Sequence, residues 1–63
     1  MNDQVQVSIW LEPAQALALA QFVKRVRWTE VRQNATGDDE ADLMMDAMRI
    51  LAKALQEAGY APR

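Results

Sequence analysis

The pattern of apolar and polar residues divides the chain into one short alternating stretch and two longer helical stretches. From Gln4 to Leu11 apolar and polar residues alternate, so that an extended backbone would carry the apolar ones on one side. These apolar residues are Val5, Val7, Ile9 and Leu11. A period of two is typical of a half-buried β-strand, and we therefore expect a strand over residues 4–11.

The second stretch follows Glu12-Pro13 and has the composition of a helix. Proline is favoured in the first helical turn, where its missing N–H costs no hydrogen bond. From there to about residue 33 the chain is rich in Ala, Gln, Leu, Lys and Arg, which are good helix formers. One face of such a helix collects the large apolar residues Leu19, Phe22, Val23 and Val26. The sequence therefore predicts an amphipathic helix over residues 13–33.

A turn-rich segment, residues 34–38, separates this helix from a second one that we expect over residues 39–58. Asp38 or Asp39 is suited to cap its N-terminus, and Thr36 is a weaker candidate. At the other end, the Gly that follows the last expected helical residue can adopt the positive φ of a Schellman ending. A short tail, residues 61–63, completes the chain.

These elements predict a mainly α, β-α-α domain over residues 1–63, with one strand before an antiparallel two-helix hairpin. No second strand is available to pair with residues 4–11, and an unpaired strand exposes a row of backbone N–H and C=O groups. A chain of 63 residues also buries only roughly 60% of its unfolded surface. We therefore expect a homodimer in which the strand pairs across the interface. The interface residues would be Val5, Val7, Ile9 and Leu11.

The second helix has more apolar surface than one neighbouring helix can cover. Its apolar residues extend over well more than half of the circumference. Either the strand or another subunit must pack on the remainder. The methionines Met44, Met45 and Met48 are either ordinary core or an adaptable binding surface.

The composition argues against catalysis and against a bound cofactor. The chain has no His and no Cys, so neither a nucleophile paired with an imidazole base nor a thiolate metal site can form. Gly37 and Gly59 are the only glycines, which excludes a glycine-rich phosphate loop. The acidic run over residues 38–42 lacks the spacing of a calcium loop and suits the positive end of a helix. We expect no enzyme, no cofactor and no metal.

Charge and hydropathy narrow the range of partners. The net charge is −2, and residues 38–63 hold six acidic residues against three basic ones. This balance argues against general binding of nucleic acid. No apolar run approaches the roughly 20 residues of a membrane span, and the N-terminus lacks the features of a signal peptide. We expect a cytoplasmic protein that does not enter a membrane.

Two sets of polar and aromatic residues are candidate binding sites. On a continuous helix Lys24, Arg25 and Arg32 all lie within reach of Trp28. Bases around an aromatic ring would suit a phosphate or an acidic partner; alternatively, Trp28 packs in a dimer interface and the Lys and Arg stems shield it.

The second set lies on the polar face of the expected strand and consists of Gln4, Gln6 and Ser8. In a two-stranded ribbon these side chains would stand in a row that fits the DNA major groove, where Gln reads adenine. The alternative is a plain solvent-exposed face of the sheet.

The order strand, helix, helix in a small dimer resembles the ribbon-helix-helix repressors and antitoxins. The resemblance implies that Gln4, Gln6 and Ser8 fall near base-reading positions. The chain departs from that family in its longer first helix, in a ribbon without Lys or Arg, and in the acidic start of its second helix.

A second resemblance, in the amino-acid sequence itself, covers nearly the whole chain. It is carried by Phe22-Val23-Lys24-Arg25-Val26-x-Trp28-x-Glu30-x-Arg32-x-Asn34-Ala35, Asp39-Glu40-Ala41 and Glu57-Ala58-Gly59-Tyr60-Ala61-Pro62-Arg63. These segments resemble a family of small uncharacterised proteins of Gram-negative bacteria, often encoded on phages, plasmids and integrated elements. The resemblance implies a mobile-element setting.

Together these observations favour a non-enzymatic protein-interaction module of a phage or mobile element that binds a host or phage protein. An inhibitor of a host defence complex, such as an anti-CRISPR protein, is one form of it. The alternative is a ribbon-helix-helix-like DNA-binding regulator or antitoxin.

Overall fold

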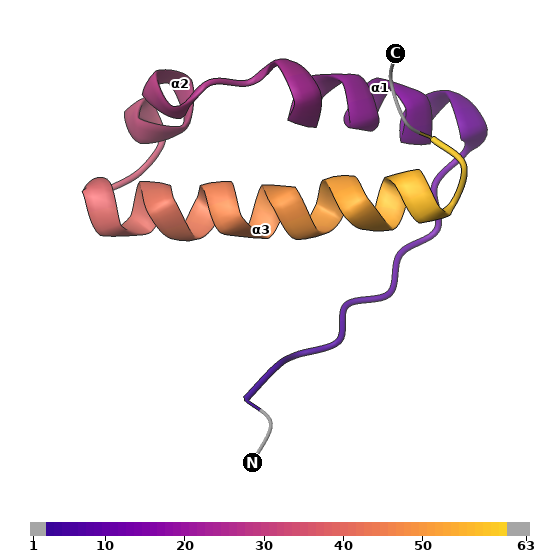
Figure 1. Cartoon of the computed structure of the whole chain (residues 1–63), viewed down its shortest axis with the longest axis horizontal. Helices are drawn as coiled ribbons and strands as arrows, with labels where there is room; N and C mark the ends of the chain where they lie inside the picture. Colours follow the sequence, from indigo (N-terminus) through magenta and orange to yellow (C-terminus); the bar gives the residue numbers. More distant parts are fainter. Residues whose placement is uncertain (1–2, 61–63) are drawn as a thin grey trace.

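The computed structural model describes residues 3–60 and contains three α-helices (Figure 1). They are α1 (Pro13–Arg25), α2 (Trp28–Gln33) and α3 (Asp38–Glu57). An extended segment, residues 3–12, precedes them. The expected C-terminal tail, residues 61–63, lies outside the described residues. The prediction of a small, mainly α protein is confirmed.

The helices form a single layer. α1 and α2 follow one another along one side of α3, which runs back in the opposite direction (Figure 1). The principal extents of the chain are 33 × 33 × 17 Å, so the molecule is flat and about half as thick as it is wide. Its radius of gyration is 12.8 Å, against about 10.6 Å for a compact chain of this length. Both broad faces of α3 are therefore poorly covered.

The expected strand over residues 4–11 is wrong, and with it the β-α-α order and the strand pairing across a dimer. Residues 3–12 are extended, and no strand occurs anywhere in residues 3–60. Alternating residues favour an extended backbone, but a strand also needs a neighbour that accepts and donates its ladder of hydrogen bonds. In this chain the segment leaves the helical body at the start of α1 and extends away from it, without a parallel or antiparallel neighbour (Figure 1).

The single helix expected over residues 13–33 is also wrong, because the chain breaks it into α1 and α2. Val26 and Arg27 adopt extended conformations, with ψ of 138° and 161°. The backbone N–H of Arg27 donates to Oε1 of Glu30 at 2.9 Å, and this bond caps the new helix at its start. β-branched residues, which favour helices weakly, are frequent around the break and lower the cost of interrupting the helix there.

The start of α3 differs in detail from the sequence prediction. The N-cap is Gly37, so Asp38 and Asp39 are the first helical residues and do not cap the helix. Their carboxylates nevertheless lie at the positive end of the helix, where they are favourable. Thr36 does not cap through its side chain either; its backbone N–H donates to Oε1 of Glu40 at 2.9 Å.

The end of α3 has the predicted Schellman geometry. Gly59 has a φ of 97°, and its N–H donates to the carbonyl oxygen of Gln56 at 2.9 Å. The N–H of Tyr60 donates to the carbonyl oxygen of Leu55 at 2.8 Å. Tyr60 also packs against the core that contains Leu55, as the motif requires.

The hydrophobic core is small and consists largely of alanine. The buried residues within 3–60 are Ala16, Ala20, Val31, Ala41 and Leu55. The expected core face of the first helix is only partly confirmed: Leu19 packs against this core, whereas Phe22 is 60% exposed. α1 approaches α3 through small side chains, which brings the backbones close and leaves the larger apolar residues outside.

Candidate functional site

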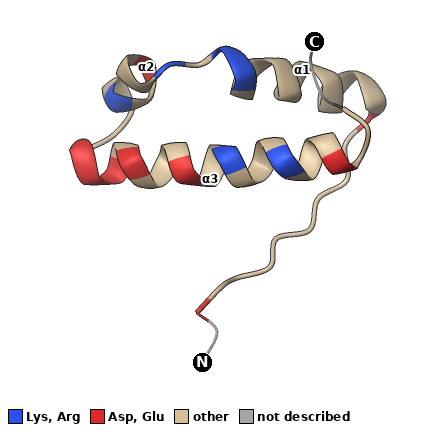
Figure 2. Cartoon of the chain, viewed as in Figure 1, with Lys and Arg blue, Asp and Glu red and all other residues tan. Residues whose placement is uncertain are grey.

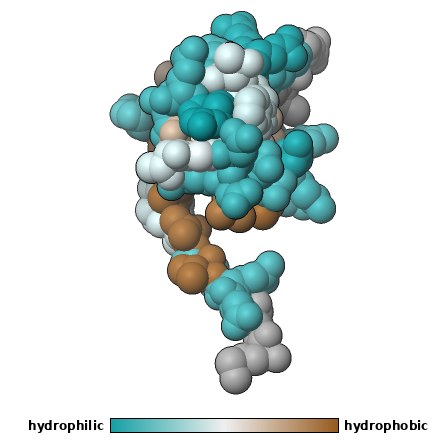
Figure 3. All heavy atoms as spheres, turned by 90° about the vertical axis from the view of Figure 1, so that its left-hand side faces the viewer, coloured by the Kyte–Doolittle hydropathy of each residue, from teal (hydrophilic) through white to brown (hydrophobic). Residues whose placement is uncertain are grey.

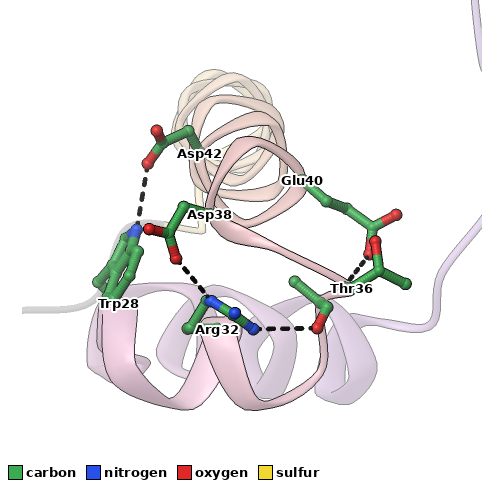
Figure 4. Close-up of polar contacts among 7 residues, drawn as sticks. Trp28, Arg32, Thr36, Asp38, Glu40 and Asp42 are labelled. Atoms are coloured by element: carbon green, nitrogen blue, oxygen red, sulfur yellow. Dashed lines mark hydrogen bonds and ion pairs between the residues drawn. The ribbon is translucent and has the colours of Figure 1, made fainter.

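The side chains of Trp28 and Arg32, two residues of the predicted basic patch, point toward acidic residues of α3 (Figure 4). Nε1 of Trp28 donates to Oδ1 of Asp42 at 3.1 Å. Nε of Arg32 donates to Oδ1 of Asp38 at 2.7 Å, and its Nη1 donates to the carbonyl oxygen of Ala35 at 3.2 Å. The two donor residues lie one helical turn apart on α2, and the two acceptor residues lie one turn apart on α3.

We call Trp28, Arg32, Asp38 and Asp42 the α2–α3 clasp, because the two bonds hold the short helix against the long one. Its ion pair is exposed, with 40% of the Arg32 side chain and 74% of the Asp38 side chain accessible. Exposed pairs of this kind contribute about 0–1 kcal/mol to stability. The clasp therefore sets the position of α2 more than it stabilises the fold.

Lys24 and Arg25, the other two residues of the predicted patch, lie in the last turn of α1, on the far side of the break. Because α1 and α2 are separate helices, the spacing that placed all three bases around Trp28 no longer holds. Neither side chain makes a hydrogen bond or ion pair within residues 3–60. The structure thus brings Trp28 and Arg32 together with acids and leaves Lys24 and Arg25 apart from them.

An apolar groove lies between the extended N-terminal segment and α3. The alternating apolar residues of the segment form one wall, and a row of α3 residues forms the other. Its volume is about 630 Å³. We call this feature the apolar groove; its lining is Val5, Val7, Ile9, Leu11, Ala16, Ala47, Ile50, Leu51, Ala54, Leu55, Ala58 and Tyr60.

The side chains at the rim of the apolar groove are unusually exposed for their type. Val5 is 84% exposed, Val7 78% and Ile50 72%. Figure 3 shows apolar atoms along the extended segment and on the neighbouring underside of the helical body. Contiguous apolar exposure of this kind marks interaction surfaces in soluble proteins.

The total accessible surface supports the same conclusion. The chain exposes 5610 Å², whereas a compact monomer of 7.1 kDa exposes about 4,100 Å². The excess of about 1,500 Å² matches or exceeds what one partner contributes to a stable protein–protein interface, about 800 Å². The chain therefore exposes enough surface for a protein–protein interface.

A second hollow lies between α2 and α3 and contains two of the three central methionines. Its volume is about 540 Å³, and its apolar lining includes Phe22, Val26, Val31, Met44 and Met48. The methionine side chains are half-buried. They are thus partly core, and they also form the floor of an open hollow.

The polar residues Gln4, Gln6 and Ser8 lie on the extended segment and are exposed. Because no strand is present in residues 3–60, they do not form a face of a ribbon. Trp10 is 98% exposed on the same segment.

The sequence predicts uncovered apolar surface on the second helix but not which of its residues line the apolar groove. A signal for them is the spacing of Leu43, Ala47, Ile50 and Ala54, which follow one another at intervals of four, three and four residues. That spacing is typical of a helix that packs against another helix.

The acidic start of α3 has structural partners. Asp38 binds Arg32, and Glu40 accepts the N–H of Thr36, as described above. Within residues 3–60, no group of three or more acidic side chains is placed to hold a metal ion. None of the helices in the same range combines the length and apolar character needed to cross a bilayer.

Comparisons with curated proteins and with solved structures found no match. A family model, in contrast, matches the sequence over residues 1–63. This match confirms the expected similarity to a family without an assigned activity, whereas the phage or mobile-element origin remains a prediction. The chain belongs to the Family of unknown function (DUF7706).

Proposed function

We propose that this chain is a non-enzymatic binding protein whose apolar groove takes up another protein. The observation that carries the proposal is the pairing of two exposed apolar walls, one from the extended segment and one from α3. Burying apolar surface is worth about 25 cal/mol per Å², so covering even part of the excess surface would drive association.

A protein partner fits the groove better than nucleic acid does. Val5, Val7 and Ile50 offer nothing to a phosphate, and the segment over residues 3–12, which forms one wall of the groove, carries no basic residue (Figure 2). The alternative of a ribbon-type DNA-binding regulator depended on a strand that is absent from residues 3–60.

As the setting of this binding we propose a phage or mobile element in the bacterial cytoplasm, with a host or phage protein, such as a host defence complex, as the target. This part of the proposal rests on the sequence resemblance and not on the fold. The large exposed surface of this small chain agrees with such a binding role.

The test uses two neighbouring residues of the extended segment that differ in the side they face. Val7 lines the apolar groove, whereas Ser8 does not. Tagged wild type, Val7→Glu and Ser8→Glu would be expressed in a bacterial host, and the captured proteins would be quantified by mass spectrometry.

The two variants add the same charge to the same exposed segment. We expect Val7→Glu to lose at least 10-fold of the specific capture and Ser8→Glu to keep it, because only the first puts a charge into the groove. Equal capture by all three proteins would show that the groove is not the binding surface.

A further inference from the structure

The α3 wall of the apolar groove continues beyond it as a regular stripe on the helix. Leu43, Ala47, Ile50 and Ala54 succeed one another at the spacing by which two helices interlock. Leu43 is 69% exposed and Ile50 72%, and both alanines are also exposed. We call these four residues the α3 stripe.

We infer that a second copy of this chain occupies the apolar groove, with its α3 antiparallel to the first along the α3 stripe. The inference rests on the proposed function of the groove as a protein-binding surface and places a second copy there, so a host or phage target would compete with the second copy for the groove. It differs from the strand-paired dimer expected from the sequence, since the contact is between helices.

The α3 stripe is complementary to itself only in the antiparallel direction. When two copies are related by a two-fold axis near residues 48 and 49, Leu43 lies opposite Ala54 of the second copy. Ala47 then lies opposite Ile50 of the second copy. Every large side chain meets a small one, which lets the helices interlock without voids. In a parallel pair, large would face large and small would face small.

The residues beside the α3 stripe are complementary in the same arrangement. On one side Asp46 comes next to Lys53 of the second copy, and on the other Met44 comes next to Leu51 of the second copy. Asp46 already binds Nη1 of Arg49 at 2.6 Å, whereas Lys53 has no ion-pair partner within residues 3–60. The two-fold axis doubles each of these contacts.

The surface that the chain exposes leaves room for a dimer. It exceeds that of a compact chain of the same mass by about 1,500 Å², whereas each partner in a standard interface buries about 800 Å². The extended segment contributes to this area, because the second helix would lie between it and α3. Val5 and Val7, exposed in the single chain, would then contact the second copy.

Cysteine cross-linking tests the direction of the helices, and the natural chain contains no Cys to interfere. In the antiparallel dimer Leu43→Cys of one copy faces Ala54→Cys of the other. A 1:1 mixture of the two single variants is therefore expected to form the mixed disulfide under mild oxidation. Each variant alone should not cross-link, because its two thiols lie about 16 Å apart along the helix axis, beyond disulfide reach.

The cross-linking result is read directly from intact masses. A mixed disulfide with little of either symmetric one supports the inference. Strong cross-linking of each variant alone, as a parallel pair would give, overturns it, and so does the absence of any cross-link in the mixture.

A charge exchange provides a second, independent test that does not depend on oxidation. Asp46→Lys and Lys53→Glu are each expected to weaken dimerisation by about 10-fold or more, as measured by sedimentation equilibrium. The double variant restores opposite charges across the interface and should recover most of the loss. Failure to recover, or no effect of the single changes, would contradict the arrangement.

The outcomes also separate the inference from the proposed function. A wild-type chain that stays monomeric while Val7→Glu still abolishes capture of another protein refutes the second copy and leaves the groove as a binding surface. If the chain cross-links as a dimer and Val7→Glu captures other proteins as well as wild type does, the groove is not the site for a target, but the dimer stands.

Discussion

Replacing Ile50 by Ser should reveal whether the apolar groove is covered in solution. Burying an Ile side chain completely is worth about 1.5–3 kcal/mol. Because Ile50 remains 72% exposed in the single chain, about 1–2 kcal/mol is left for a partner to provide. A symmetric dimer buries two such side chains. Replacing both should cost about 2–4 kcal/mol of association free energy, which weakens the association about 30- to 1,000-fold.

The assay is thermal unfolding, followed by circular dichroism at two protein concentrations about 100-fold apart. For a dimer, mass action stabilises the folded state by about 2.7 kcal/mol when the ligand, here the second copy, is at about 100 times its dissociation constant. We therefore expect the Tm of wild type to rise with concentration and the Tm of Ile50→Ser to rise much less. Ile and Ser have similar helix propensities, so the change should reflect the lost contact and not α3 itself.

The control is Gln56→Ser, which changes an exposed residue of α3 outside the α3 stripe. It should keep the concentration dependence of wild type. If Ile50→Ser and wild type unfold at the same temperature at both concentrations, no partner covers Ile50, because an exposed Ile in a complete monomer contributes little to stability.

Three further predictions concern the single chain. Leu55→Ala should lower the free energy of unfolding by about 2–5 kcal/mol, because Leu55 is the largest side chain of a small core; a loss below about 1 kcal/mol in urea titrations would contradict that role. Trp28→Phe should cost about 0.5–1.5 kcal/mol through the lost bond to Asp42, and equal stability of variant and wild type would show that the α2–α3 clasp does not form. Gly59→Ala should lower the free energy of unfolding by about 1 kcal/mol, and Gly59→Asn should lower it by less. The cost comes from the backbone conformation alone, because φ is 97° and nothing lies within 4 Å of an added Cβ. An Ala variant as stable as wild type would argue against the Schellman ending.

The sequence predicts α3 well, because both ends of this helix carry local signals. Glycines lie at its two ends, Gly37 before it and Gly59 after it, and acidic residues fill its first turn. Its 20 residues also repeat the apolar pattern often enough to leave no ambiguity. The N-cap differs from the expectation, and the helix begins and ends one residue earlier than the expected range 39–58.

The break between α1 and α2 could not be predicted from local propensity. Val26 and Arg27 are neither Gly nor Pro, and a continuous helix would also satisfy the apolar pattern around them. The break is accompanied by contacts outside α2 itself, because Arg32 bonds to Asp38 six residues later and Trp28 to Asp42 fourteen residues later. For the same reason the predicted patch around Trp28 failed in part, since it assumed one helix.

The N-terminal segment shows what an alternating pattern does and does not determine. The alternation correctly assigned Val5, Val7, Ile9 and Leu11 to one apolar side, and these residues line the apolar groove together. It could not supply a neighbouring strand, because hydrogen-bond pairing depends on a second segment that residues 3–60 do not contain.

Sedimentation equilibrium of the wild-type chain across a dilution series shows directly whether a second copy covers the exposed surface of α3 and the N-terminal segment. We expect the mass of a dimer that dissociates only at low concentration. For Ile50→Ser we expect this dissociation to shift to higher concentration. The mass of a single chain at every concentration would contradict the self-association of this protein.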